Sequence, residues 1–126
     1  MHIGLWLFSA LVSLIYFSYS LAMKNAAGQA KNQINLPIEH VDHEDDIENH
    51  RQVYQAKLIN SSDIIVVYKY TAGPKEGDKE GTFYSGNPKD NGSIEYSPIS
   101  LYPELAENCF FVLSSAFKEQ AKKLTN

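Results

Sequence analysis

The sequence has 126 residues, a formal net charge of −4, 44% hydrophobic residues and 21% charged ones. This length fits one small domain, since soluble domains commonly run to about 100–200 residues. The acidic balance excludes a strongly basic nucleic-acid-binding protein, and the composition excludes a collagen and a coiled-coil rod. The length also excludes a multidomain enzyme.

The chain opens with an apolar segment. Residues 3–17 are almost entirely apolar, and residues 1–22 contain no Asp, Glu, Lys or Arg. A secretory signal peptide has an apolar region of about 7–15 residues followed by small residues at the cleavage site. Ser20 and Ala22 meet this requirement, which predicts cleavage before Met23. The segment lacks the basic start that is usual in bacterial signal peptides.

The same segment is also compatible with an uncleaved hydrophobic helix from Ile3 to Met23. At about 1.5 Å per residue, such a helix crosses a bilayer core of about 30 Å. Lys24 and Lys31 follow it and would then place the rest of the chain on the cytoplasmic side. A buried helix of a soluble core is the third alternative. Residues 1–22 are therefore predicted to be a signal peptide or a membrane anchor, in a secreted or single-pass membrane protein.

Residues 23–50 are predicted to be a polar and acidic linker. Residues 23–37 lack a sustained apolar face, and residues 39–48 hold six acidic residues and no basic one. Residues 51–126 contain nine basic and nine acidic residues, so the net negative charge comes from the acidic stretch. No basic patch suited to phosphate binding remains, and nucleic acid is not expected as a partner.

Residues 51–126 carry the patterns of a small folded domain. Residues 64–70 are β-branched or aromatic except for Lys69, which is typical of a strand. Asn91-Gly92 is the dipeptide that type I′ hairpin turns prefer. We expect an antiparallel sheet of about three or four strands. The candidate strands are residues 51–59, where strand and helix periods compete, 64–70, 82–85 and 93–97.

The last predicted element is a helix from about Leu101 to Leu124. Pro103 and Glu104 suit its first turn, and lysines occupy its last turns. Apolar residues recur with a 3.6-residue period, which predicts one buried face. The predicted class is α+β, with the sheet packed on this helix and preceded by an N-terminal hydrophobic helix. The apolar stripe consists of Leu105, Cys109, Val112, Leu113, Ala116, Phe117 and Leu124.

Cys109 is the single cysteine, so no intramolecular disulfide can form. Its place in the apolar stripe predicts a buried, inert thiol. The chain also contains two N-glycosylation sequons, Asn60-Ser61-Ser62 and Asn91-Gly92-Ser93. They become relevant if the chain enters a eukaryotic secretory pathway.

Two sets of residues are candidates for a functional site. His40, His43 and His50 lie alongside Asp42, Glu44, Asp45 and Asp46, and imidazole with carboxylate suits zinc, nickel or copper. A solvated acidic segment that contains histidines is the alternative. The second set is aromatic and could form a partner-binding face, because tyrosine is enriched in interfaces. It consists of Tyr68, Tyr70, Phe83, Tyr84 and Tyr96.

These observations favour a non-enzymatic protein-interaction module that is exported or tethered to a membrane. A protein partner is expected, with the membrane as a further contact if residues 3–23 are retained. No cofactor is expected. The alternatives are a metal-binding protein that uses residues 39–50 and a small accessory subunit of a membrane complex. An enzyme would need site residues that the sequence does not group.

Overall fold

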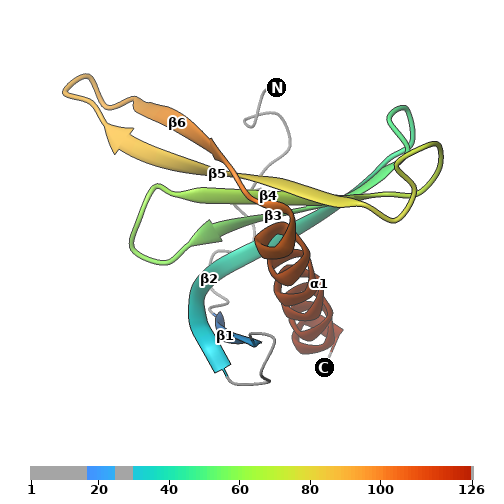
Figure 1. The fold of residues 1–126 in the computed structure, drawn as a ribbon. Helices are drawn as coiled ribbons and strands as arrows, with labels where there is room; N and C mark the ends of the chain where they lie inside the picture. The colour runs from blue at the N-terminus through green and yellow to red at the C-terminus, as the bar shows by residue number, and fades with distance from the viewer. Residues whose placement is uncertain (1–16, 25–29, 126) are drawn as a thin grey trace.

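The computed structural model describes residues 17–24 and 30–125 and shows an antiparallel sheet with one helix across one face (Figure 1). The α+β class and the packing of the sheet on the C-terminal helix are confirmed. The prediction of three or four strands is too low, because β2–β6 form a five-stranded meander and β1 pairs with the first part of β2. The elements are β1 Phe17–Lys24, β2 Ala30–Asp46, β3 Arg51–Leu58, β4 Ile64–Tyr70, β5 Lys79–Pro88, β6 Ile94–Ser100 and α1 Pro103–Thr125.

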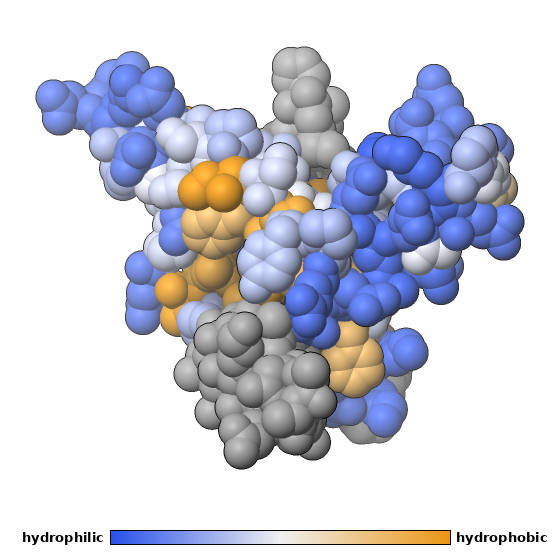
Figure 2. All heavy atoms as spheres, in the orientation of Figure 1, coloured by the Kyte–Doolittle hydropathy of each residue, from blue (hydrophilic) through white to orange (hydrophobic). Residues whose placement is uncertain are grey.

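The turns of the meander lie at two opposite ends of the sheet. The β3–β4 and β5–β6 turns lie together at one end, on the left in Figure 1, and the β2–β3 and β4–β5 turns lie at the other. Both ends are hydrophilic projections in Figure 2, whereas apolar side chains gather beside the helix between them. The turns are therefore exposed to solvent, and the core is confined to the middle of the sheet.

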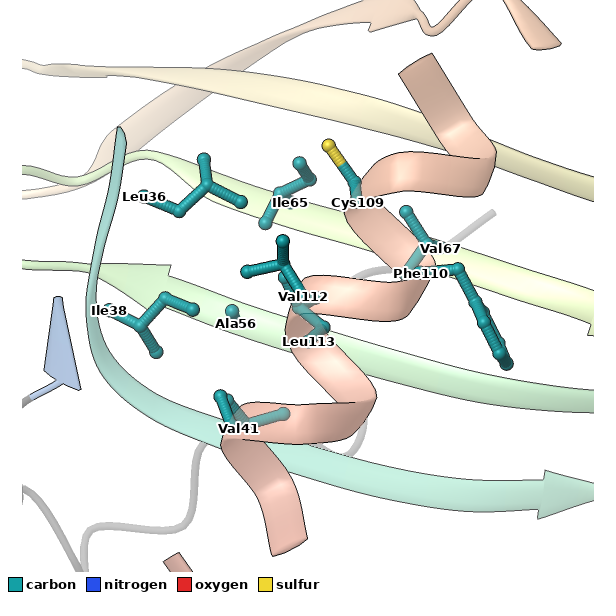
Figure 3. Packing of buried hydrophobic residues seen from close by; sticks show 11 residues of the cluster. Leu36, Ile38, Val41, Ala56, Ile65, Val67, Cys109, Phe110, Val112 and Leu113 are labelled. Carbon is teal, nitrogen blue, oxygen red and sulfur yellow. The ribbon is translucent and has the colours of Figure 1, made fainter. Parts of the chain in front are cut away.

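The main core lies between the sheet and α1 (Figure 3). Val112, Leu113 and Ala116 of the predicted apolar stripe are buried, while Leu105 and Phe117 are partly buried against the same core. Ala106 and Phe110 are buried as well, although they are not part of the predicted stripe, and the side chain of Leu124 lies outside the described residues. Cys109 is also buried in this core, and burial raises the pKa of its thiol to about 11. The thiol is therefore protonated and inert at neutral pH, as predicted. From the sheet, the core contains Leu36, Ile38, Val41, Ala56, Ile65 and Val67.

A β-bulge in β2 allows residues on both sides of it to contribute to the core. Ile38 is paired with Leu58 and His40 with Lys57, so Glu39 is the extra residue. Before the bulge the even-numbered Leu36 and Ile38 are buried in the core, and after it the odd-numbered Val41 is. The bulge shifts the alternation by one residue, since an inserted residue reverses the side-chain phase.

The prediction that residues 23–50 form a linker is wrong for most of this stretch, because residues 30–46 form β2. This strand is difficult to recognise from the sequence for two reasons. Its buried positions change phase at Glu39, and its second half is acidic. Cross-strand pairing with β3, including Asp46 opposite Arg51, overrides the weak strand propensity of the acidic residues.

The predicted N-terminal hydrophobic helix falls mainly on residues 1–16, which lie outside the described residues. The helical alternative that continues to Met23 is wrong over residues 17–23, because these belong to β1. Their sequence alternates large apolar residues with serine or alanine, a period of two that favours a strand. Within the part of the chain that the structure describes, no helix is both long and apolar enough to cross a membrane.

Gln120 of α1 completes the hydrogen bonding of β2. Its side-chain Oε1 accepts a hydrogen bond from Val41 N at 3.0 Å, and its Nε2 donates one to Val41 O at 2.9 Å. The pairing of β1 with β2 ends at Ile38, so among the described residues no strand reaches Val41 on this side. The buried Gln120 amide takes the place of that missing strand.

We expect Gln120→Ala to destabilise the fold by about 1–3 kcal/mol, because it leaves the buried N–H and C=O of Val41 without these partners. Urea unfolding of the full chain measures this loss. Lys118→Ala, at a nearby exposed position of the same helix, is the matched control and should change stability by less than about 0.5 kcal/mol. Equal stability of the two variants would contradict the role assigned to Gln120.

The edge strand β6 contains Pro98 at a position that faces away from its neighbour. Leu101 N donates to Gly81 O and Lys89 N donates to Ser93 O, which fixes the odd-numbered residues of β6 as the hydrogen-bonded ones. The even-numbered Pro98 therefore costs the sheet no hydrogen bond. Its missing N–H interrupts the outer edge, a device by which natural sheets resist edge-to-edge pairing.

Pro98→Val should restore the outer row of donors and promote pairing of β6 with another copy. Light scattering and size-exclusion chromatography at increasing concentration are expected to show association of the variant and not of the wild type. Pro103→Ala, a proline outside the sheet at the start of α1, serves as the control. A Pro98→Val chain with wild-type hydrodynamic behaviour would show that Pro98 does not protect this edge.

Candidate functional site

The candidate site lies on the sheet face opposite α1, here called the far face. The buried hydrophobic residues of this face include Val53, Ile64, Val66 and Tyr84, which form a cluster separate from the core under the helix. Residues directly opposite one another in neighbouring strands share a face. The pairing of Val53 with Tyr68 and of Tyr68 with Glu80 therefore extends this face toward the β2–β3 and β4–β5 turns.

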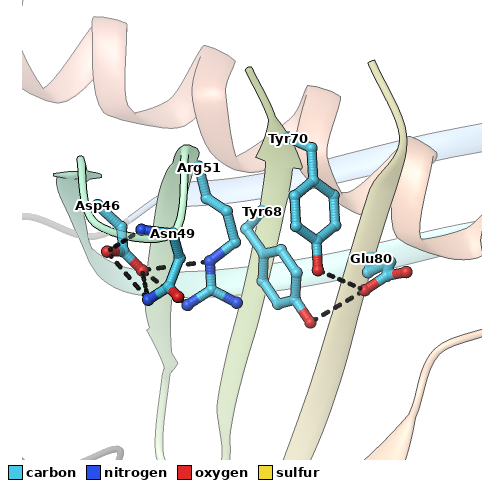
Figure 4. A network of polar contacts seen from close by, with 6 residues as sticks. All are labelled: Asp46, Asn49, Arg51, Tyr68, Tyr70 and Glu80. Atoms are coloured by element: carbon cyan, nitrogen blue, oxygen red, sulfur yellow. Dashed lines mark hydrogen bonds and ion pairs between the residues drawn. The ribbon is translucent and has the colours of Figure 1, made fainter. Parts of the chain in front are cut away.

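Two tyrosines of β4 form the centre of the site (Figure 4). Tyr68 and Tyr70 are two residues apart and half-buried, and their rings meet edge to face with centroids 5.7 Å apart. Both hydroxyl groups donate to Oε1 of Glu80 on β5, at 3.2 and 3.3 Å. The shared acceptor fixes the two rings relative to each other, so the pair presents a preformed aromatic surface.

Arg51 of β3 covers the first of these rings. Its guanidinium carbon lies 4.4 Å from the centroid of the Tyr68 ring, within the range of a cation–π interaction. The same guanidinium donates through Nη2 and Nε to Oδ2 of Asp46, at 2.7 and 3.2 Å. Asn49 donates its side-chain amide to the same carboxylate. We call Arg51, Tyr68, Tyr70 and Glu80 the aromatic array.

The surroundings of the array set its charge state. Burial, reinforced by Glu80, raises the pKa of Tyr68 to about 12, so its phenol stays protonated as a donor. Burial would raise the pKa of Glu80, but hydrogen bonds from Lys75, Tyr68 and Tyr70 outweigh it and leave that pKa below its ordinary value. The hydrogen bond from Arg51, with those from Asn49, lowers the pKa of Asp46. At neutral pH the array thus holds the neutral phenol of Tyr68 between charged groups.

A surface pocket of about 260 Å³ adjoins the array at the β2–β3 turn. Its wall includes Arg51 and also Ile47, whose side chain is 81% exposed at the tip of the turn. An apolar side chain this exposed contributes little to the fold, and it shares the pocket with the charged side chains of Asp45, Asp46 and Arg51. The other lining residues are Asp45, Asp46, His50, Gln52 and Thr71.

The structure brings together most of the aromatic residues that the sequence predicts for partner binding. Tyr68, Tyr70, Tyr84 and Tyr96 belong to or pack against the far-face cluster or its extension. Tyr84 is buried and acts as part of that cluster. Phe83 lies on the other face, where it packs against the core under α1. The reason is the strand period of two, which sends Phe83 and Tyr84 to opposite faces.

The three predicted metal ligands are placed apart. His40 is on the far face, buried, with Nε2 2.8 Å from Asp42 Oδ1. His43 is on the helix face, where its ring stacks near Tyr54 and Phe117. His50 is exposed in the β2–β3 turn with φ of 54°. Among the described residues no group of three or more histidine, cysteine, aspartate or glutamate side chains is arranged to hold a metal ion.

Sequence reasoning did not select Arg51, Glu80 or Asp46. Each belongs to a different element from the tyrosines, and no short motif connects them. The signal that could have found them is the strand register, which sets Tyr70 opposite Arg51 and Tyr68 opposite Glu80. Comparisons of the chain with protein-family models, with curated proteins and with solved structures find no match.

The lowered pKa of Glu80 predicts how acid affects stability. A carboxyl group with a lowered pKa in the folded state stabilises the fold above its ordinary value of 4.5, and this contribution is lost as the pH falls through and below that value. We expect the wild type to lose more unfolding free energy than Glu80→Gln between about pH 6 and pH 3.

Urea unfolding at each pH is the measurement for this difference. Glu119→Gln is the matched control, since Glu119 lies on the exposed side of α1, in a surface pair with Lys122. The control should follow the pH dependence of the wild type. If Glu80→Gln also follows it, the hydrogen bonds to Glu80 do not stabilise the fold as inferred.

Proposed function

We propose that this protein is a non-enzymatic protein-interaction module that is exported or tethered to a membrane. Its partner binds the aromatic array and the adjoining pocket at the β2–β3 turn. The observation that carries the proposal is the support of two half-buried tyrosines by Arg51 and Glu80. Arginine and tyrosine are the residue types that most often dominate binding energy at interfaces, together with tryptophan.

Rigidity of the array favours binding. Ordering a mobile side chain on association costs about 0.5–1.5 kcal/mol, so side chains that are fixed beforehand make binding more favourable. Tyr68 and Tyr70 are fixed by Glu80, and Arg51 is fixed by Asp46. The exposed Ile47 adds an apolar contact at the edge of the same surface.

The charges around the array indicate the chemistry of the partner. Asp45, Glu44 and Glu48 are exposed on β2 or its turn, and Arg51 is already paired with Asp46. Like charges across an interface oppose association, and complementary ones accelerate it. We infer a protein partner that presents basic side chains around an apolar or aromatic centre.

A non-enzymatic role is supported by the state of the strongest potential nucleophile. Cys109 is buried on the face of α1 that packs on the sheet, and its raised pKa keeps the thiol protonated. A catalytic cysteine requires an accessible and electropositive site. The export part of the proposal rests on the uncharged apolar segment at residues 3–17.

Binding can be tested with the full chain as bait in an extract of the native source. We expect the captured protein to bind the purified wild type directly, and Tyr70→Ala or Arg51→Ala to weaken this binding by about 2 kcal/mol, or roughly 30-fold in Kd. Tyr102→Ala is the matched control, since Tyr102 is 51% exposed just before α1. Melting temperatures establish that each variant is folded.

Tyr70→Phe refines the test, because it removes only the hydroxyl group that Glu80 accepts from. An intermediate loss of affinity is expected, since the ring remains while one of its restraints is lost. If the array variants and the Tyr102→Ala control bind with equal affinity, the partner does not use the array and the proposed surface is wrong.

A further inference from the structure

We propose that Asn91, at the tip of the β5–β6 hairpin, is an acceptor for N-linked glycosylation. The inference rests on the export that is part of the proposed function. Asn91-Gly92-Ser93 meets the sequence requirement for this modification. The modification also requires an accessible asparagine, and every residue from Asn87 to Glu95 is exposed.

The hairpin projects from the body of the molecule. It forms the hydrophilic extension at the upper left of Figure 2, at the end of the sheet away from the aromatic array. Its strands are held by the pairing of Pro88 with Ile94, and Lys89 N donates to Ser93 O to close the turn. A glycan at the tip would therefore displace no core side chain.

The local geometry of the sequon leaves the reactive atom out of the turn's hydrogen bonds. The Oδ1 atom of Asn91 accepts from Ser93 N at 3.0 Å and from Ser93 Oγ at 2.6 Å. These contacts use the oxygen of the carboxamide and bring the hydroxyl group of the sequon beside it. Gly92 adopts φ of 87° and has open space around it, so the middle position does not obstruct approach.

The reaction is a group transfer with a lipid-linked oligosaccharide pyrophosphate as co-substrate. Nδ2 of Asn91 forms a bond to the anomeric carbon of the first sugar. The bond between that carbon and the pyrophosphate oxygen breaks, and its electron pair leaves with the lipid pyrophosphate. Nδ2 loses one proton. No oxidant or reductant is required.

The second sequon differs in its surroundings. Asn60 is exposed in the β3–β4 turn, but Ser62 is packed against β5 so closely that a Cβ on Gly86 would meet its Cβ at 2.6 Å. Asp63 of the same turn accepts a hydrogen bond from Gly86 N. The hydroxyl-bearing residue of this sequon is thus fixed against the sheet, and the proposal assigns the glycan to Asn91.

A glycan at Asn91 is compatible with the proposed partner surface. The hairpin and the aromatic array lie at opposite ends of the sheet, because the β5–β6 turn is at one end and the β2–β3 and β4–β5 turns are at the other. The glycan would shield the exposed strand β6 and its tip while leaving Arg51 and the two tyrosines accessible.

The test is expression of the full chain in cultured animal cells in two forms, one with its own N-terminus and one with a standard cleavable signal peptide in front. We expect a shift in electrophoretic mobility that peptide-N-glycosidase removes. Ser93→Ala should abolish the shift, and Ser93→Thr should retain it. Asn60→Gln should also retain it. Mass spectrometry after enzymatic release should locate the modified asparagine at position 91.

The two forms separate the site from the export step. A glycan on the signal-fused chain alone would support the acceptor site at Asn91 and would contradict export by the chain's own N-terminus. A signal-fused chain that is secreted without a glycan would overturn the proposal. A glycan that persists in Asn91→Gln and disappears in Asn60→Gln would also overturn it.

Discussion

A single extra residue in β2 controls which side chains of this strand reach the helix. The bulge at Glu39 places Leu36 and Ile38 on the same face as Val41, although these residues do not share one alternation of the strand. Without it, the second half of β2 would turn Val41 away from α1 and His40 toward it. Burial of Val41 at the helix then brings its backbone within reach of Gln120. The Gln120 side chain makes the hydrogen bonds to Val41 N and O that β1 does not provide, since the pairing of β1 ends at Ile38.

This constraint divides the sheet into faces with different roles. The helix face is filled by apolar side chains from β2, β3, β4 and α1. The far face holds a smaller apolar cluster and, toward one end, the aromatic array. His40 and His43 illustrate the division, because the first is paired with a carboxylate on the far face and the second contacts aromatic rings on the helix face. Residues three apart in a strand cannot act on one ligand as they can on a helix.

The meander also separates the two ends of the sheet. One end carries the β2–β3 and β4–β5 turns. There Asp46 pairs with Arg51, and Glu80 accepts hydrogen bonds from the two tyrosines. The other end carries the two sequons. A protein partner at the first end and a glycan at the second can coexist, because the length of the strands lies between them (Figure 1). The net negative charge comes from the acidic residues 39–48, most of which belong to β2 and not to a turn.

Local periodicity along the chain was enough to predict several elements. The β-branched run at residues 64–70 is β4, the apolar stripe from Leu105 to Phe117 is the buried face of α1, and Cys109 is buried as its neighbours indicate. The position of residues 30–46 emerged only from the folded chain, since a bulge changes the strand's phase and acidic side chains mask its propensity. The same holds for the aromatic array, because Arg51, Tyr68 and Glu80 come from three strands. Their proximity arises from register, which is set by hydrogen bonds between strands and not by spacing along the chain.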